Sequence, residues 1–220
     1  MPPPYCYDHP RPAVTVDLVV FALKGDALRT LFIKRRHDPF AGRWALPGGF
    51  MEIEEPVEAA ARRELREETG LELAGPVEFV GVFGNPGRDP RGRTISLVHA
   101  AVVPGKCPQV TGGDDAAEAA WLDPRSLRGL AFDHDQVLAS ALDWLAKGVE
   151  EGRLGLGLLP LPFRVKDVRG LHRAAALPEG QASRWLARLR RARRAVPVPG
   201  RKGWYQAERS ASQRISNPIE

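Results

Sequence analysis

Cysteine is scarce in this sequence of 220 residues, which contains only Cys6 and Cys107 and no CxxC pair. Two isolated cysteines do not make a disulfide framework, so we expect a protein of the reducing cytoplasm. Long hydrophobic runs are lacking as well, because the longest, Leu18–Leu23, is far too short to cross a bilayer. Residues 1–12 have neither the basic nor the apolar region of a secretory signal. These features predict a soluble, cytoplasmic protein with no membrane partner.

Charge is distributed unevenly along the chain. Residues 161–220 carry 14 Lys or Arg against four Asp or Glu, a net charge of +10. The first 160 residues carry 18 against 23, a net charge of −5. A basic segment attached to an acidic body is a reason to consider nucleic acid, so double-stranded DNA is a candidate partner.

The length predicts one domain of ordinary size, about 150 residues, with a smaller one beside it. We place the first domain at 1–147. The segment 148–159 has the glycine content of a linker and separates this domain from a basic one at 160–207. Residues 208–220 are expected to form a disordered tail.

The most informative segment runs from Gly49 to Leu71 and reads GFMEIEEPVEAAARRELREETGL. It follows a Pro-Gly pair, and such a turn favours residues that reach positive φ without a steric penalty. Pro56 suits the first position of a helix, and the residues after it are good helix formers. Gly70 suits the position just past the last turn. The segment therefore predicts a glycine turn followed by a helix.

Three glutamates share one face of this predicted helix. Glu64, Glu67 and Glu68 are spaced i, i+3 and i+4, so their carboxylates project together and repel one another. A hard divalent cation removes that repulsion, since Mg²⁺ prefers carboxylate and phosphate oxygens. Arg63 is placed to hold a neighbouring glutamate in position. A solvated acidic helix is the alternative, but it does not account for the glycine turn and the isolated Glu55 in the same pattern.

The complete spacing resembles the signature of the Nudix hydrolases at every fixed position: Gly49, Glu55, Arg63-Glu64-Leu65, Glu67-Glu68 and Gly70-Leu71. Members of that family use divalent cations to cleave a nucleoside diphosphate that is linked to another group. The resemblance implies Mg²⁺ as the cofactor, with Mn²⁺ able to replace it.

The same resemblance implies a role for each residue of the signature. Glu64 and Glu68 are the expected central metal ligands, and Glu67 and the carbonyl of Gly48 complete the metal set. Glu64 also belongs to the expected catalytic group, together with Arg63 and Glu55. In that group Arg63 orients Glu64. Glu55 is expected to serve as a ligand or as a proton acceptor.

Apolar and β-branched runs surround the signature. They predict strands at 14–21, 31–33, 77–83, 94–103 and 119–122. A further helix is predicted at 133–145, where Asp133 and Gln136 have capping-box spacing. Strands and helices in this order fit an α/β fold, and the resemblance implies the Nudix α/β/α sandwich around a mixed sheet.

Four further stretches resemble one branch of the family, the ADP-ribose pyrophosphatases and the related bacterial transcriptional regulators of NAD metabolism. They lie at 11–21, 34–50, 84–96 and 131–138. Pro86 stands fifteen residues after Leu71, where ADP-ribose-cleaving members carry a marker proline. Asn-Pro-Gly is also ordinary turn chemistry, so a purely structural role for this proline stays open.

Arginines in these stretches are candidate substrate-binding residues. Arg36, Arg88 and Arg91 join Pro86 in that set, because guanidinium groups recognise phosphate through paired hydrogen bonds. Loop arginines are otherwise simply solvated, and this alternative stays open as well. His134, near the start of a predicted helix, is interpreted as structural.

The basic segment predicts two helices, at 163–176 and 181–195, and then a small hairpin around 197–203. This order suggests a small winged helix-turn-helix, and the regulators pair a Nudix domain with such a module. The candidate DNA-binding residues lie on the second helix and in the hairpin: Arg184, Arg188, Arg191, Arg201 and Lys202. A solvated helix face, or a module for dimerisation or packing, is the alternative.

Two functions follow from these expectations. The first is a Mg²⁺-dependent hydrolase that cleaves a nucleoside diphosphate derivative, with ADP-ribose converted to AMP and ribose 5-phosphate. The second is an ADP-ribose-responsive, DNA-binding regulator of NAD metabolism, acting as a homodimer on a palindromic site. An intact signature favours the first. ADP-ribose, NADH, nucleoside triphosphates and other diphosphates all remain open as the true substrate.

Overall fold

The computed structural model describes residues 8–113 and 115–208, so Cys6 and all but the first residue of the expected tail at 208–220 lie outside it. The described chain divides into two compact units. The first unit comprises residues 8–21, 30–101 and 108–141, and the second comprises 22–29, 102–107 and 142–208.

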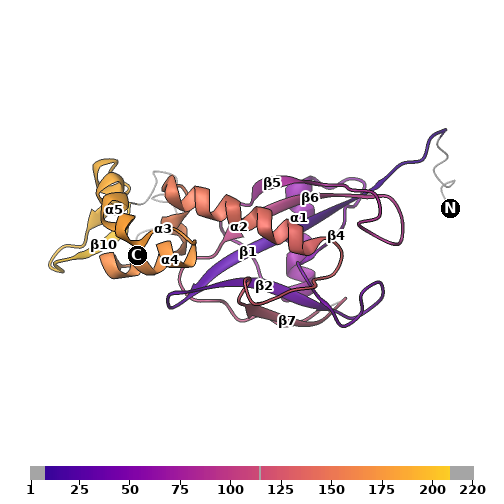
Figure 1. Ribbon diagram of the computed structural model, residues 1–220, viewed down its shortest axis with the longest axis horizontal. Helices are drawn as coiled ribbons and strands as arrows, with labels where there is room; N and C mark the ends of the chain where they lie inside the picture. Colours follow the sequence, from indigo (N-terminus) through magenta and orange to yellow (C-terminus); the bar gives the residue numbers. More distant parts are fainter. Residues whose placement is uncertain (1–7, 114, 209–220) are drawn as a thin grey trace, which may run out of the picture. The chain divides into compact units, whose positions relative to one another are not determined.

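The first unit is built on a sheet whose main path runs β3-β2-β1-β6-β5 (Figure 1). Two more strands attach to this path, since β4 pairs with β1 and β7 pairs with β2. The strands are β1 (Ala13–Lys24), β2 (Ala27–Arg35), β3 (Trp44–Ala45), β4 (Gly48–Phe50), β5 (Glu78–Phe83), β6 (Thr94–Val102) and β7 (Ala116–Leu122). The five predicted strands are therefore present, and most are longer than expected.

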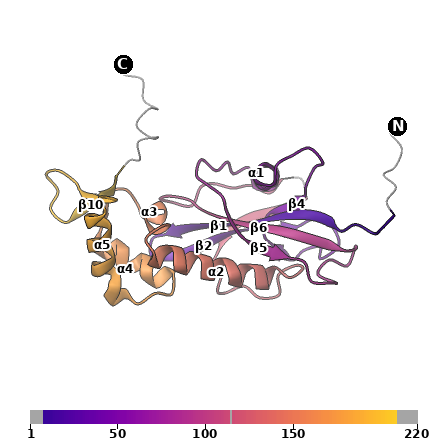
Figure 2. The same cartoon turned by 90° about the horizontal axis from the view of Figure 1, so that it is seen from above.

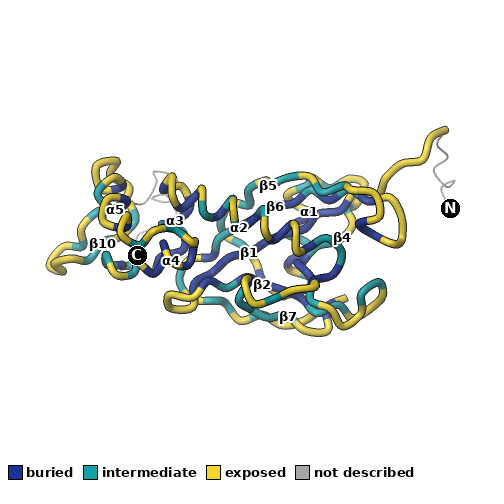
Figure 3. Tube along the Cα trace, in the orientation of Figure 1, coloured by how far each residue is buried: buried dark blue, intermediate teal, exposed yellow. Residues whose placement is uncertain are grey.

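The central strands are buried along most of their length (Figure 3). In β1 every residue from Thr15 to Leu23 is buried, which is typical of a strand that is covered on both faces. Helix α1 (Val57–Thr69) and the first turns of α2 (His134–Glu150) supply these covers on opposite faces of the sheet (Figure 2). The expected α/β/α sandwich is confirmed. Among the described residues, no helix is both long and apolar enough to span a membrane.

Helix α1 begins and ends close to where its sequence predicts. Pro56 has an extended backbone with φ −65° and ψ 148°, so it is the N-cap and not the first helical residue. Gly70 ends the helix in the left-handed conformation with φ 69°, and its N–H donates to the Arg66 carbonyl. The helix turns Ala60, Ala61 and Leu65 toward the core, and Glu68 is buried as well, while Glu64 and Glu67 are half-buried.

The second unit contains the predicted pair of helices and a three-stranded antiparallel sheet of order β8-β10-β9. Its elements are α3 (Gly155–Leu158), β8 (Phe163–Arg164), α4 (Val165–Ala174), the 3-10 turn η1 (Glu179–Gln181), α5 (Ala182–Arg191), β9 (Ala195–Pro197) and β10 (Trp204–Ala207). Phe163, Leu171, Trp185, Leu186 and Leu189 are buried. Helices followed by a β-hairpin give the expected winged-helix arrangement.

The segment 148–159, for which the glycine content predicts a linker, is folded in the structure. It contains the end of α2 and the whole of α3, and Val149, Leu158 and Leu159 are fully buried. The glycines are required for close packing. A Cβ on Gly155 would lie 2.5 Å from the Trp185 ring, and one on Gly148 would overlap the Leu154 side chain. The boundary between the units therefore differs from the predicted one.

We expect Phe32→Ala to lower the free energy of unfolding by about 3–5 kcal/mol, because it would open a cavity at a fully buried side chain of β2. Phe79→Ala is the matched control, since Phe79 is 56% exposed and its change should stay within about 0.5 kcal/mol. Urea unfolding of both variants measures the difference. Equal losses for the two would contradict the placement of Phe32 in the core.

Candidate functional site

A cavity of about 580 Å³ lies in the first unit, between the glycine turn, helix α1 and the loop that carries Arg88 and Arg91. Its charged lining is mostly acidic and consists of Asp17, Glu64, Glu67, Glu68, Asp89 and Asp115, with Arg35, Arg88 and Arg91 as the basic groups. The rings of Phe50, Phe132 and His134 complete most of the wall. The structure thus brings the acidic face of the predicted helix and the arginines of distant segments to one place.

The glycine turn packs against α1 with no space for side chains. Strand β4 pairs with β1 so that Gly48 lies opposite Asp17 and Gly49 opposite Val16. A Cβ on Gly49 would lie 2.5 Å from the Glu64 carboxylate, and one on Gly48 would overlap the Val16 carbonyl. The backbone N–H of Gly48 donates to Glu68 Oε2 over 2.9 Å. Gly49 therefore sets how closely the acidic helix approaches the turn, and Gly48 sets how closely the turn approaches β1.

Arg63 connects the glutamates of the signature. Its Nε and Nη2 donate to the two carboxylate oxygens of Glu55 over 3.0 and 2.6 Å. Its Nη1 donates to Glu64 over 2.9 Å and to Glu67 over 3.0 Å. The hydrogen bonds with Glu55 raise the pKa of Arg63 above its ordinary value, and they lower the pKa of Glu55. Arg63 thus contacts Glu64, Glu67 and Glu55, and Glu55 does not line the cavity.

Glu64 and Glu68 are acids in a poorly solvated place. Burial raises the pKa of Glu68 to about 8, even though the Gly48 N–H favours its charged form, and the charges of Glu64 and Asp17 raise it further. Burial also raises the pKa of Glu64, against the opposite effect of Arg63. Such carboxylates are stabilised in their charged form by a cation.

The donor set fits a hard divalent cation by its chemistry. Glu64, Glu67 and Glu68 supply carboxylate oxygens, which such cations prefer. Within residues 8–113 and 115–208, however, no three acidic, histidine or cysteine side chains converge as a ready ligand set. Glu64 and Glu67 turn toward Arg63, and the Gly48 N–H holds Glu68. Burial is the main cause of the raised pKa of Glu64 and Glu68.

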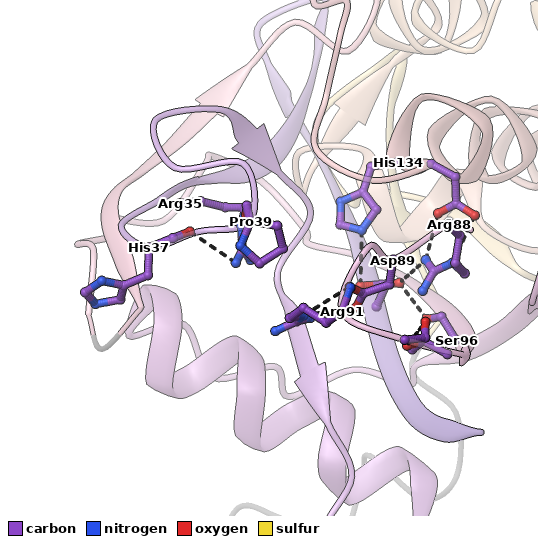
Figure 4. A network of polar contacts seen from close by, with 12 residues as sticks. Arg35, His37, Pro39, Arg88, Asp89, Arg91, Ser96 and His134 are labelled. Carbon is purple, nitrogen blue, oxygen red and sulfur yellow. Dashed lines mark hydrogen bonds and ion pairs between the residues drawn. The ribbon is translucent and has the colours of Figure 1, made fainter. Parts of the chain in front are cut away.

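The floor of the cavity is a buried network around Asp17, whose partners Arg88, Ser96 and His134 are labelled in Figure 4. Asp17 accepts a 2.5 Å hydrogen bond from Ser96 and faces Arg88 at 3.4 Å and His134 Nε2 at 3.5 Å. Burial alone would raise the pKa of Asp17, but His134, Ser96 and Arg88 together hold it below its ordinary value. The Leu46 N–H donates to His134 Nδ1, so Nε2 carries the ring proton of the neutral imidazole. His134 thus connects the segment before the glycine turn to β1.

The predicted substrate-binding residues are placed in different ways. The Arg88 side chain is only 5% exposed and its guanidinium pairs with Asp133 at 2.7 Å, so it mainly supports the floor. Arg91 lines the cavity, pairs with Asp89 and is 45% exposed. Arg36 and Pro86 do not line the cavity, and Arg36 donates to the Ala116 carbonyl.

Arg35 and Asp17 line the cavity, although the sequence patterns do not predict either of them as a site residue. Arg35 is the last residue of β2 and lines the cavity, whereas Arg36, which follows it directly, does not. Alternation of side chains along an extended segment separates two such neighbours, but the sequence does not reveal which of them faces the site. Asp17 is the one acidic residue of an otherwise apolar or β-branched stretch, Val14–Phe21, and this irregularity was its available signal.

In the second unit the predicted DNA-binding residues are all exposed. Arg184 and Arg191 lie on α5, and Lys202 lies in the turn between β9 and β10. Arg188 donates to the Glu150 carbonyl, which places it against the end of α2. Arg201 stacks on the Trp204 ring, 4.4 Å from its centroid.

A glycine turn packed on an acidic helix beside a cavity of about 580 Å³ is the arrangement of a class of hydrolases that is defined by this signature. The NUDIX domain family matches residues 11–145, so the chain belongs to the Nudix family and is a Nudix pyrophosphohydrolase by class. Nudix hydrolases in general use divalent cations.

Known proteins resemble the chain beyond the signature. It is 44% identical over 133 residues to an ADP-ribose pyrophosphatase of Methanocaldococcus jannaschii, covering 60% of this chain and 75% of that protein. It is 32% identical over 168 residues to an ADPR-responsive transcriptional repressor of Acinetobacter baylyi, covering 75% of this chain and 67% of that protein. A MutT/nudix family crystal structure from Enterococcus faecalis covers 93% of this chain and 90% of its own, with 24% identity and a TM-score of 0.78. That last likeness extends the shared fold across both units.

We expect the stability of the metal-free protein to fall as pH rises from about 4.5 to about 8. Glu68 has an ordinary pKa of 4.5 and a folded pKa of about 8, so in this window the folded state retains a proton that the unfolded state has lost. The loss approaches about 1.4 kcal/mol for each pH unit. Urea unfolding in a chelator at several pH values measures it, and Glu68→Gln should flatten the profile. A wild-type profile that is already flat would contradict the raised pKa.

Proposed function

We propose that the protein hydrolyses ADP-ribose to AMP and ribose 5-phosphate with Mg²⁺ as its cofactor, which Mn²⁺ can replace. The observation that supports this most strongly is the pair of carboxylates of half-buried Glu64 and buried Glu68, which lie against the glycine turn within one cavity. The ADP-ribose pyrophosphatase of Methanocaldococcus jannaschii, at 44% identity, supports the choice of substrate. We place the activity in the cytoplasm.

In this proposal Glu64, Glu67 and Glu68, with the carbonyl of Gly48, hold the cation. When bound, it neutralises charge on the diphosphate oxygens and makes a water molecule more acidic. The chain's own residues prepare that place. Arg63 holds Glu64 and Glu67 by 2.9 and 3.0 Å hydrogen bonds, and the Gly48 N–H holds Glu68.

Glu55 acts indirectly in this proposal, through its contact with Arg63. It pairs with Arg63 at 2.6 Å and also accepts the Glu52 N–H at 2.8 Å, so its carboxylate is already occupied. We therefore assign Glu55 a positioning role through Arg63, in preference to a direct role as ligand or proton acceptor.

We expect Glu64→Gln and Glu68→Gln each to lower kcat/KM for ADP-ribose by about 10³-fold or more, because each removes a charged oxygen that binds the cation. Glu58→Gln is the matched control, since Glu58 lies on the same helix but pairs with Arg62 on its surface. Release of AMP with Mg²⁺ gives the rate, and circular dichroism confirms folding. Near-wild-type activity in either site variant would refute the metal assignment.

A second function is supported by the winged-helix unit. We propose that the protein also binds double-stranded DNA as a homodimer and responds to ADP-ribose. The exposed Arg184 and Arg191 on α5, with Arg201 and Lys202 in the hairpin, form a basic surface that suits phosphate contacts. The Acinetobacter baylyi repressor, at 32% identity, supports this reading. Arg188 is left out of this surface because it contacts the Glu150 carbonyl.

We expect Arg184→Ala and Arg191→Ala to weaken DNA binding and to lower the salt dependence of the affinity. Each lost phosphate contact should reduce the slope of log K against log salt by about 0.9. Mobility shifts on the protein's own upstream region, with and without ADP-ribose, measure both effects. Arg128→Ala, an exposed arginine of the first unit, is the control. Binding without sequence preference at moderate salt would count against a regulator.

A further inference from the structure

Two arginines from distant segments meet at one aromatic ring in the cavity. The guanidinium carbon of Arg35, at the end of β2, lies 5.0 Å from the centroid of the Phe132 ring. That of Arg91 lies 5.7 Å from the same centroid and 5.0 Å from that of Phe50. All four residues line the cavity, and both arginines are labelled in Figure 4.

Each guanidinium donates its hydrogen bonds from Nε and Nη2. Arg35 donates from Nε to the Pro39 carbonyl over 2.7 Å and from Nη2 to the His37 carbonyl over 3.3 Å. Arg91 donates from Nε and Nη2 to the Asp89 carboxylate, the latter over 2.8 Å. Among the residues that the structure describes, Nη1 of neither arginine makes a hydrogen bond. These groups remain available to an anion.

The two arginines also repel each other. Burial lowers the pKa of Arg35, and the charge of Arg91 is the next largest cause of that shift. The carboxylates of Glu68, Asp115 and Asp89 act in the opposite direction. Asp89 forms an ion pair with Arg91 and so neutralises one of the two guanidinium charges. The two arginines together therefore retain positive charge that a ligand can neutralise.

Phe132 is held in place at a conformational cost. Its φ of 55° lies in the left-handed region, which bulky residues rarely adopt. Phe40, which packs edge-on against it at 4.9 Å, has a φ of 67°. Two neighbouring phenylalanines in this region indicate a local constraint of the kind that gathers at ligand sites. The ring is thereby fixed where both guanidiniums reach it.

We propose that Arg35 and Arg91 form a diphosphate clamp, with Phe132 as the positioning residue that keeps the two guanidiniums together. This inference rests on the proposed function, and it names how the same cavity selects its ligand. A diphosphate presents two phosphoryl groups and engages both arginines, whereas a monophosphate engages one. Each product of hydrolysis is a monophosphate, so the clamp favours the substrate over the products.

Calorimetry of ADP and AMP binding to the full chain, in a chelator, tests the clamp without requiring turnover. Arg35→Ala and Arg91→Ala should each weaken ADP binding about tenfold or more and AMP binding about threefold or less. The double variant should lose less than the product of the two single losses, because the first substitution already breaks the pair. Arg128→Ala is the control for loss of one exposed positive charge.

Phe132 is tested by Phe132→Leu, which retains apolar volume but removes the aromatic face, and by Phe132→Tyr, which retains that face. We expect Phe132→Leu to weaken ADP binding about fivefold and to raise KM with kcat within twofold, and Phe132→Tyr to restore both. A purely structural residue would instead change the unfolding midpoint and leave the ratio of ADP to AMP affinity unchanged.

Unchanged ADP binding in the arginine variants, or equal losses for ADP and AMP, overturns the clamp. The proposed function fails differently. If the wild type does not hydrolyse ADP-ribose but its ADP affinity still depends on Arg35 and Arg91, the clamp stands and the assigned reaction does not.

Discussion

The approach of the glycine turn to helix α1 is the contact on which the site depends. Gly49 has no Cβ, and the Glu64 carboxylate occupies the space that one would fill. Gly48 directs its N–H at Glu68, and β4 attaches this turn to β1 opposite Asp17. A side chain at Gly49 would collide with Glu64 of the helix, and one at Gly48 would collide with Val16 and Asp17 of β1. The acidic site is therefore a consequence of backbone packing as much as of side-chain identity.

Two arginines balance the acids that this packing concentrates, and they do so differently. Arg63 lies at the rim and serves Glu55, Glu64 and Glu67, so it keeps carboxylates together that would otherwise repel. Arg88 is buried between Asp17 and Asp133 and joins β1 to the start of α2. Arg88 neutralises the carboxylates of Asp17 and Asp133 and so stabilises the floor of the cavity. Arg63 neutralises Glu64, which still lines the cavity. The same residue type thus supports the scaffold in one place and the chemistry in the other.

Local sequence patterns predict the longer strands and helices, but not the short elements β3, β4, α3 and β8. Helix α1 was predicted because propensity, the position of Pro56 and the stop at Gly70 agree, and only the N-cap moved by one residue. The segment 148–159 was interpreted wrongly as a linker, because glycine density does not distinguish flexibility from close packing. Gly155 is glycine because Trp185, distant in sequence, occupies the space beside it.

In the site, too, some features follow from local sequence and others from tertiary packing. The spacing of Glu64, Glu67 and Glu68 along a helix was sufficient to place three acids on one face, since helical geometry is local. Only the folded chain decided that Arg35 and not Arg36 lines the cavity. It also decided that Arg88 forms ion pairs with the buried Asp17 and with Asp133. These outcomes depend on contacts between residues far apart in the chain, as between Arg88 and Asp133 or Arg35 and Phe132. A local pattern has no information about such neighbours, because they are set by the packing of the sheet and its helices.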